Sequence, residues 1–444
     1  MALSFSIGIL LFAAGAIVSI VFRRSPRFSL YLVHLMTGLG SLAWLVSAID
    51  VLLGHPLRWS VLGQPLPFMK WSLSLDGLAA FFMLILAVVT LFISFFAPGY
   101  LRSYLHRKNL WSLLMGLNLF VLSMGLVITA GDGWSFLFFW EAMALTSFFL
   151  VMFEHEEKKN RLAGFIYLIM THVGTVFIIA LLLILRRQTG SLDFSVMKMH
   201  AAQIPANLRN LIFLFAMIGF GTKAGMAPLH IWLPRAHPAA PSHISALMSG
   251  VMVKTAIYAF VRLSFDILGG GPAWWGLLIV LIGLVTSLLG VLYALVEQNL
   301  KKMLAYSSVE NIGIILLALG AALYLRAAGK EFLSLLALSA AFIHTMNHAL
   351  FKSLLFLGVG AVQQQTHTRN VEKLGGLIRG MPWTAAFFLI GSLAISAMPF
   401  TNGFIGEWRT LQGLLSMGSV PSDPLLRMVG PVAASGLALT GGLA

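Results

Sequence analysis

The sequence predicts an all-α polytopic membrane protein with about fourteen transmembrane helices and two inverted five-helix repeats, each containing a broken helix. The class follows from composition, because hydrophobic residues make up 59% of the 444 residues and charged residues only 10%. Soluble domains carry roughly a quarter charged residues, so this chain has too few to cover a water-facing surface. Its length leaves room for about a dozen helices of some 20 residues, joined by short connections.

Apolar runs recur along the whole chain, and most gaps between them are short and polar or contain Gly or Pro. The first run is followed by three arginines and has no small-residue cleavage site, so we expect a retained helix rather than a signal peptide. The last run stops at Ala444, and we expect that helix to be truncated. The runs lie near 3–22, 29–53, 77–97, 110–130, 133–153, 162–185, 209–227, 244–264, 273–296, 304–325, 332–360, 383–405, 406–417 and 426–444.

Two runs carry residues that interrupt a helix. Gly225 and Pro228 lie in GFGTKAGMAPLHIWLP, and Pro399 and Gly403 lie in SAMPFTNGFIGEW. Interrupted helices are tolerated in membranes where a cavity or a neighbouring helix satisfies the freed backbone groups, and a matched pair of them points to inverted repeats. We therefore expect three N-terminal helices, a first repeat, a second repeat and a last helix, at 1–109, 110–264, 265–417 and 418–444.

Lys and Arg in the loops predict the orientation, because they are enriched on the cytoplasmic side. With the N-terminus outside, fifteen of them fall inside and nine outside, which predicts an inner-membrane protein with its N-terminus outside. The inside set is Arg23, Arg24, Arg27, Arg102, Arg107, Lys108, Lys158, Lys159, Arg161, Arg235, Lys301, Lys302, Arg369, Lys373 and Arg379. The outside set is Arg58, Lys70, Arg186, Arg187, Lys198, Arg209, Arg262, Arg326 and Lys330. The net charge of +14 comes largely from these scattered residues, so we expect no nucleic-acid partner.

The chain has no cysteine, which excludes disulfides, thiolate zinc sites and iron–sulfur clusters. The pair His344 and His348 has the i, i+4 spacing of a metal or haem site, but no acidic ligand or CxxCH motif stands nearby. We expect no metal and no cofactor. If the protein serves a redox process, its electrons run through other subunits.

Titratable residues occur inside the apolar runs, where a charge costs at least about 2.5–3.5 kcal/mol and is usually functional. Five stand out by their depth, and four more are candidates. His344, His348 and Lys352 follow one another at i, i+4 and i+8, so they share one helix face. The five are Glu141, Lys223, Lys254, Lys352 and Glu407, and the other four are His230, Glu310, His344 and His348.

Such a row predicts a proton path. A buried lysine holds its proton beside a carboxylate and releases it more easily when the carboxylate withdraws, and histidine relays protons near neutrality. Glu141 paired with Lys223 would hold the proton, and separation would release it toward His230, Lys254 or the histidines, with Glu407 as an exit or second gate. The alternative is a set of structural ion pairs or of lysines that reach the interface. Five such residues at matching places in two repeats favour the path.

Several segments are similar to a known family. GTKAGMAPLHIWLPRAHPAAPSHISALMSGVMVKTAIYAFVR, FLFFWEAMALTSFFLV, FIHTMNHALFKSLLFLGVG and NGFIGEW resemble the antiporter-like subunits of respiratory complex I and its relatives. LAYSSVENIGIILLALG, which contains Glu310, is most similar to the branch found in group 4 nickel–iron hydrogenases and formate hydrogenlyase.

The resemblance implies a fourteen-helix fold and a module that pumps protons, or exchanges sodium for protons, driven by redox subunits of a hydrogenase or complex I-like assembly. It implies that Glu141 and Lys223 are the coupling pair and that Lys254 is the central lysine. It further implies that His348 and Lys352 are connecting groups and Glu407 the terminal site.

Three alternatives remain. The first is a subunit of a multi-subunit Na⁺/H⁺ antiporter without a redox partner. The second is a membrane-embedded enzyme or quinone-reducing core, against which the lack of cysteine, nucleotide-binding and metal motifs speaks. The third is a carrier for a small organic ion, whose polar groups would cluster at the breaks rather than spread over successive helices.

Overall fold

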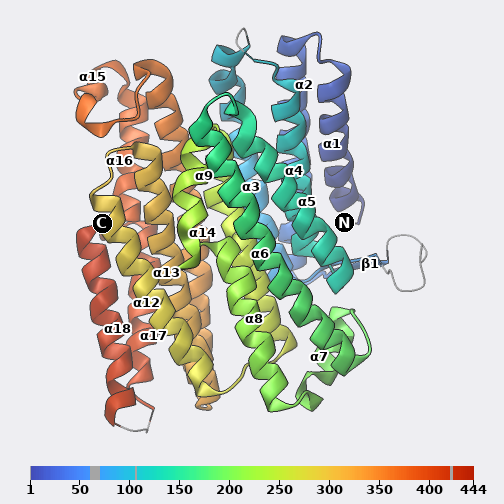
Figure 1. Cartoon of the computed structure of the whole chain (residues 1–444), viewed down its shortest axis with the longest axis vertical. Helices are drawn as coiled ribbons and strands as arrows, with labels where there is room; N and C mark the ends of the chain where they lie inside the picture. Colours follow the sequence, from blue (N-terminus) through green and yellow to red (C-terminus); the bar gives the residue numbers. More distant parts are fainter. Residues whose placement is uncertain (1, 61–70, 106–107, 421–423) are drawn as a thin grey trace.

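The computed structural model describes residues 2–60, 71–105, 108–420 and 424–444. Long, roughly antiparallel helices form one bundle, and a small β-hairpin projects from its side (Figure 1). The N-terminal part contains α1 (Ala2–Val21), α2 (Pro26–Leu52), β1 (Leu57–Ser60), β2 (Ser72–Leu75), α3 (Gly77–Leu101) and η1 (Arg102–Tyr104). The middle part contains α4 (Trp111–Thr129), α5 (Gly133–Val151), η2 (Met152–Glu154), α6 (Lys158–Thr189), α7 (Phe194–His200), η3 (Ala201–Gln203), α8 (Ala206–Ala224), η4 (Leu229–Trp232), α9 (Leu233–Ala239), α10 (Ser242–Leu247), η5 (Met248–Met252), α11 (Val253–Val261) and η6 (Arg262–Ile267). The last part contains α12 (Ala273–Leu295), α13 (Leu300–Ala327), α14 (Glu331–Thr366), η7 (Val371–Lys373), α15 (Leu377–Gly380), α16 (Pro382–Ile395), α17 (Asn402–Met417) and α18 (Pro424–Leu443).

Within the described residues, eleven helical segments are long and apolar enough to cross a membrane, and α16 is a shorter apolar helix. This confirms a multi-pass, helical membrane protein, whereas the count of about fourteen helices and the inverted repeats stay predictions. The hairpin was not predicted: β1 and β2 are antiparallel, with Leu57 opposite Leu75. Lys70 and Arg107, which entered the charge count, lie outside the described residues.

The two ends of the bundle carry different connections. The turn between α1 and α2 and the short helix α15 lie at one end, and α7 lies at the other (Figure 1). This separation agrees with the alternation used in the charge count, which assigns the first two to one side of the membrane and α7 to the opposite side. The segments Ser242–Ile267 and Leu300–Ala327 have their apolar windows buried completely, so they form the centre of the bundle.

A seam of glycines brings α12 and α13 into close contact. Gly276, Gly283 and Gly290 recur at every seventh position of α12, and each lies against the backbone of α13. A Cβ at Gly290 would lie 2.3 Å from the backbone nitrogen of Glu310. Small residues allow such approach between membrane helices. The seam therefore sets the position of Glu310 in the centre of the bundle.

The two predicted breaks coincide with interruptions in the helices. α8 ends at Ala224, Gly225 follows with a left-handed φ of 83°, and Pro228 precedes η4. Pro399 lies between α16 and α17. Gly403, the second residue of α17, packs so closely on α16 that a Cβ would lie 1.8 Å from the carbonyl oxygen of Ala394. Residues 383–417, taken from the sequence as two runs, thus form two short helices around the second break.

Candidate functional site

Seven of the nine predicted site residues are buried, and they come from successive elements of the bundle. Glu141 and His230, on α5 and η4, are only partly buried. The seven buried residues are Lys223 on α8, Lys254 on α11, Glu310 on α13, His344, His348 and Lys352 on α14, and Glu407 on α17.

Lys223 is held by a neutral group. Its ammonium donates a hydrogen bond to the hydroxyl of Tyr167 on α6 at 2.8 Å, and that hydroxyl lies 2.6 Å from the hydroxyl of Ser147. The ammonium also lies 6.0 Å from the centroid of the Trp140 ring. Tyr167 was not among the predicted site residues, because nothing in the sequence indicates which aromatic residue of α6 faces α8.

Glu141 has partners other than the predicted one. Its carboxylate accepts a hydrogen bond from Thr175 at 2.6 Å and lies 3.5 Å from Nε2 of His172, both on α6. The side chains of Glu141 and His172 are 30% and 50% exposed at the edge of the bundle. Glu141 and Lys223 interact electrostatically but form no ion pair within 4 Å. The predicted pair is therefore an interaction at longer range, with Tyr167 at the lysine and His172 at the glutamate.

Lys254 lies at the centre, next to an unusual helical segment. Its ammonium donates to the backbone carbonyl of Ser249 within η5, which is a π-helical segment. The hydroxyl of Ser249 lies 2.7 Å from that of Ser308 on α13. π segments inside α-helices are rare and frequently occur at functional sites.

The α14 residues continue the row. The ammonium of Lys352 donates to the carbonyl of Leu304 at 3.0 Å and to the hydroxyl of Ser307. Nε2 of His344 lies 3.1 Å from the amide oxygen of Asn311. Both ring nitrogens of His348 are buried without a hydrogen-bond partner in the described part of the chain. Buried polar atoms without partners are rare, so the ring of His348 is set apart from most buried polar groups.

Electrostatic interactions connect Lys254, Lys352, Glu310 and Glu407, and we call this row the file. Lys254 interacts with Lys352, and Lys352 interacts with Glu310. Glu310 in turn interacts with Glu407, whose carboxylate lies beside Gly441 of α18. One oxygen of Glu310 is buried and has no hydrogen-bond partner among the described residues. The file therefore runs through the bundle from α11 to α17.

A second group of buried titratable residues was missed. Lys301, assigned from the sequence to an inside loop, is fully buried in the first turn of α13, where its ammonium donates to the carbonyl of Ala240 at 2.8 Å. That assignment was wrong because α13 already begins at Leu300 and packs against α9. His237 interacts electrostatically with Lys301, Lys254 and Lys352, and His243 with Lys301. The signal available was the motif AHPAAPSH, whose two histidines stand among small apolar residues.

This second group leads toward one end of the molecule. The ring of Tyr100 lies 5.6 Å from that of His243. Tyr100 and Glu154 also line a surface hollow of about 490 Å³ between η1, η2 and the end of α14. Lysine, histidine and glutamate all take up and release protons. The hollow, the second group (His243, Lys301 and His237) and the file together therefore offer sites for stepwise proton transfer from the surface to the interior.

Comparison with known proteins agrees with this geometry. Residues 130–421 match the family described as NADH:quinone oxidoreductase/Mrp antiporter, transmembrane. The chain belongs to this family. The recognition made from the sequence motifs is therefore confirmed, and the chain is an antiporter-like membrane protein.

Two curated relatives of this family member are named as subunits of hydrogenase-4 and of formate hydrogenlyase. It is 45% identical over 382 residues to hydrogenase-4 component B of Escherichia coli K12, covering 86% of this chain and 56% of that protein. It is 34% identical over 438 residues to formate hydrogenlyase subunit 3 of the same organism, covering 98% of this chain and 69% of that one. In fold it resembles a chain of an archaeal membrane-bound sulfane sulfur reductase, with a TM-score of 0.83 and 26% identity over 98% of this chain and 69% of that chain. The sequence thus spans a little over half the length of hydrogenase-4 component B.

Proposed function

We propose that the chain is the proton-translocating, antiporter-like membrane subunit of a redox-driven complex. The complex would be a membrane-bound nickel–iron hydrogenase, a formate hydrogenlyase or an NADH:quinone oxidoreductase-like assembly. The similarity to hydrogenase-4 component B and to formate hydrogenlyase subunit 3 supports this choice. The chain would contribute the ion path, and partner subunits in the membrane and at its surface would supply the electrons and the driving force.

One observation carries the proposal: Lys223 and the two buried lysines of the file, Lys254 and Lys352, bond to neutral groups. Lys223 donates to a tyrosine hydroxyl, Lys254 to a backbone carbonyl, and Lys352 to a carbonyl and a serine hydroxyl. Lysines that only hold helices together would be expected to form buried ion pairs. Removing one charge of such a pair destabilises the protein by about 3–5 kcal/mol. A lysine with neutral partners can lose its proton without leaving an unpaired buried carboxylate.

The path we infer has two parts. Protons enter from the hollow at Tyr100 and pass along His243, Lys301 and His237 to Lys254. The file then continues along α14 and α13, by way of His348, Lys352 and Glu310, and reaches Glu407. Lys223 and Glu141 form the coupling end, where a change in their separation alters how tightly the lysine holds its proton. His230, beside the first break, is the titratable residue nearest to Lys223 in the sequence, and it would exchange protons with Lys223.

The predicted topology belongs to the same proposal. We infer an inner-membrane protein of about fourteen helices with its N-terminus outside and two inverted repeats at 110–264 and 265–417. Two interrupted helices and the separation of the loops at opposite ends support it. The transported ion would be H⁺, with Na⁺ as the alternative. The lipid bilayer would surround the helices.

The first experiment is affinity purification of the tagged chain in mild detergent, followed by reconstitution of the recovered complex into proteoliposomes that contain a pH-sensitive dye. We expect hydrogenase subunits to co-purify and the electron donor of the complex to drive proton movement. Glu141→Gln and Lys223→Gln should each reduce this movement at least about tenfold without loss of assembly, since an essential proton carrier is removed. Lys330→Gln, at an exposed position, is the control. Unchanged proton movement in the assembled Lys223→Gln complex would contradict the proposal.

A second candidate is a subunit of a multi-subunit Na⁺/H⁺ antiporter without a redox partner. The family description, which names Mrp antiporters beside NADH:quinone oxidoreductase, favours it. Recovery of small membrane subunits alone, together with proton release driven by a sodium gradient, would select this candidate and exclude the redox-driven one.

A further inference from the structure

The helix that carries Lys254 has an uncommon construction. α11 is a regular nine-residue α-helix, and it lies between two π-helical segments, η5 before it and η6 after it. Conversion of one residue between π and α geometry turns the adjoining helix by about 100° and shifts it by about 1.5 Å. The direction of the Lys254 side chain therefore depends on what fixes the two ends of α11.

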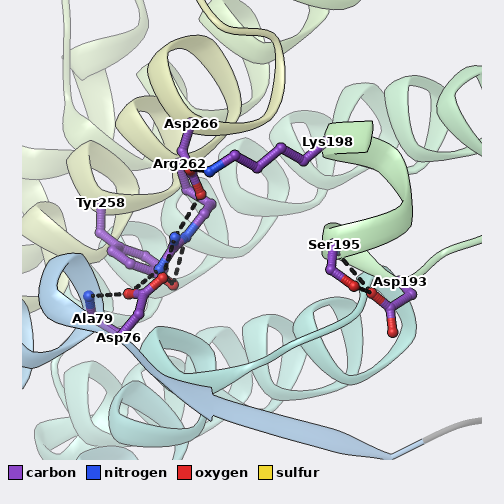
Figure 2. A network of polar contacts seen from close by, with 8 residues as sticks. All are labelled: Asp76, Ala79, Asp193, Ser195, Lys198, Tyr258, Arg262 and Asp266. Carbon is purple, nitrogen blue, oxygen red and sulfur yellow. Dashed lines mark hydrogen bonds and ion pairs between the residues drawn. The ribbon is translucent and has the colours of Figure 1, made fainter. Parts of the chain in front are cut away.

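The end of α11 away from Lys254 is fixed by a group of charges that we call the Arg262 cluster, shown in Figure 2. The guanidinium of Arg262 binds both oxygens of Asp76 at 2.6 Å and one oxygen of Asp266 at 2.7 Å. Tyr258 contacts the same guanidinium through its hydroxyl, and Lys198 of α7 binds Asp266 at 2.6 Å. Bidentate pairs of this kind fix orientation as well as distance. Asp76 is also the N-cap of α3, so the cluster ties α11 to the N-terminal helices.

The other end of α11, which carries Lys254, follows directly on the π-helical segment η5. In η5 the amide of Val253 donates to the carbonyl of Met248, five residues earlier, and not to that of Ser249. The Ser249 carbonyl instead accepts a hydrogen bond from the ammonium of Lys254. In α-helical geometry this carbonyl would accept the Val253 amide. The hydrogen bond of Lys254 is thus specific to the π geometry.

We propose that Arg262 is a positioning residue whose cluster holds α11 in the register that gives Lys254 the Ser249 carbonyl as partner. Release of the cluster lets α11 turn as a rigid segment, which moves Lys254 away from this partner and changes its relation to Lys352. The inference deepens the proposed function and rests on it, since it assigns a control element to the central lysine of the path. The ionisable groups facing Arg262 are Asp76, Asp266, Tyr258 and Lys198, and those facing Lys254 are His237, His344, His348 and Lys352.

Disulfide trapping tests the register without any measurement of transport. The chain has no cysteine of its own. A Cβ at Gly250 in η5 would lie 3.7 Å from Cβ of Ser353 on α14, within the range of about 3.5–4.5 Å that a disulfide requires. We expect Gly250→Cys with Ser353→Cys to cross-link on oxidation in the assembled complex. Adding Arg262→Gln should lower the cross-linked fraction several-fold, because a turn of α11 changes the geometry of the adjoining η5, which places position 250 against α14.

Two further variants separate positioning from general damage. Asp76→Asn keeps a good N-cap for α3 but removes the charge that faces Arg262, so it should lower cross-linking in the same direction. Lys159→Gln breaks an exposed ion pair with Glu157 at 2.8 Å and should leave cross-linking unchanged. Equal cross-linking in the Arg262→Gln, Asp76→Asn and unmodified backgrounds would overturn the inference.

A transport measurement then links the register to the path. In proteoliposomes, Arg262→Gln should shift the pH profile of proton translocation, and Arg262→Lys should restore part of it, because lysine keeps the charge but not the bidentate contact. A pH profile identical to that of the unmodified complex, despite lost cross-linking, would overturn the link to Lys254. Unimpaired translocation in Lys223→Gln would count against the proposed function and leave the cross-linking result standing on its own.

Discussion

At the scale of single residues, the buried lysines are distinguished by what binds them. Lys223 reaches Tyr167, and Lys352 reaches the backbone of α13. A hydrogen bond to a charged group makes a net contribution of about 1.5–3 kcal/mol to stability. These neutral partners therefore stabilise the ammonium, but they favour its protonated form less strongly than a paired carboxylate would. This balance suits a group that must be protonated and deprotonated in each cycle.

The Tyr167 hydroxyl gives a direct test of this balance. Tyr167→Phe removes the only oxygen that links Lys223 to Ser147 in the described structure. We expect the free energy of unfolding to fall by about 1–3 kcal/mol, because a buried ammonium loses its partner. Proton translocation by the reconstituted complex should slow as well. Tyr293→Phe, at an exposed position, is the control, and equal effects of the two changes would contradict the role of Tyr167.

The Arg262 cluster also makes a prediction about pH. Burial alone would raise the pKa of Asp76, but the hydrogen bonds and the charge of Arg262 outweigh it and hold the pKa below its usual value. A carboxylate with a lowered pKa stabilises the fold fully above the pKa of the unfolded group, about 3.9, and loses that contribution as the pH falls through the lower folded value. The difference in unfolding temperature between the unmodified protein and Asp76→Asn should therefore be constant from about pH 8 to pH 5 and shrink only below about pH 4. A difference that already shrinks between pH 7 and pH 5 would contradict this assignment.

At the scale of elements, close helix contacts set where the titratable groups lie. α12 and α13 approach along the glycine seam, and Gly406 of α17 lies against the ring of His344, where a Cβ would come within 2.6 Å of Nδ1. Because lipid provides no hydrophobic driving force between helices, such contacts depend on close van der Waals packing. The positions of Glu310 and His344 therefore depend on glycines in neighbouring helices.

The seam can be tested with a single methyl group. Gly290→Ala would bring a Cβ within 2.3 Å of the backbone of Glu310, which cannot move without displacing α13. Overpacking of this kind costs about 1–3 kcal/mol, so the unfolding temperature in detergent should fall and proton translocation should decrease. Gly99→Ala on α3, where no atom lies within 4 Å of the added Cβ, should have little effect on either measurement. If Gly290→Ala behaves like Gly99→Ala, the seam does not position Glu310.

At the scale of the whole molecule, the bundle has two ends with different connections. Ser25, in the turn between α1 and α2, is exposed at one end, and Gln188, near the end of α6, is exposed as well. With the N-terminus outside, the first lies in the cytoplasm and the second outside. The lack of natural cysteine makes both positions suitable for single-cysteine labelling.

Labelling with a membrane-impermeant thiol reagent would determine the orientation. In intact spheroplasts, Gln188→Cys should react and Ser25→Cys should not, and inverted membrane vesicles should reverse the pattern. Reaction of Ser25→Cys in intact spheroplasts would instead indicate an N-terminus inside, with the path running in the opposite direction.

The amino-acid sequence alone was sufficient to predict the membrane class, the two interruptions and the burial of the central charges. Hydrophobic runs fix the position of a residue along a helix, so Lys254 and Lys352 were recognisable from their apolar neighbours alone. Glycine and proline have backbone preferences that act locally, which is why the breaks at Gly225 and Pro399 could be predicted as well.

Which side chains meet one another follows from the folded structure and not from the sequence pattern. Tyr167 and Lys223 are 56 residues apart, and Asp76 and Arg262 are 186 apart. A membrane helix is apolar both toward lipid and toward its neighbours, so its sequence carries little information about its rotation. That is also why Lys301 was assigned to a loop and why the partners of Glu141 were not foreseen. The rotation of each helix, set by glycine contacts and π segments, selects the partners, and the partners determine what each titratable group can do.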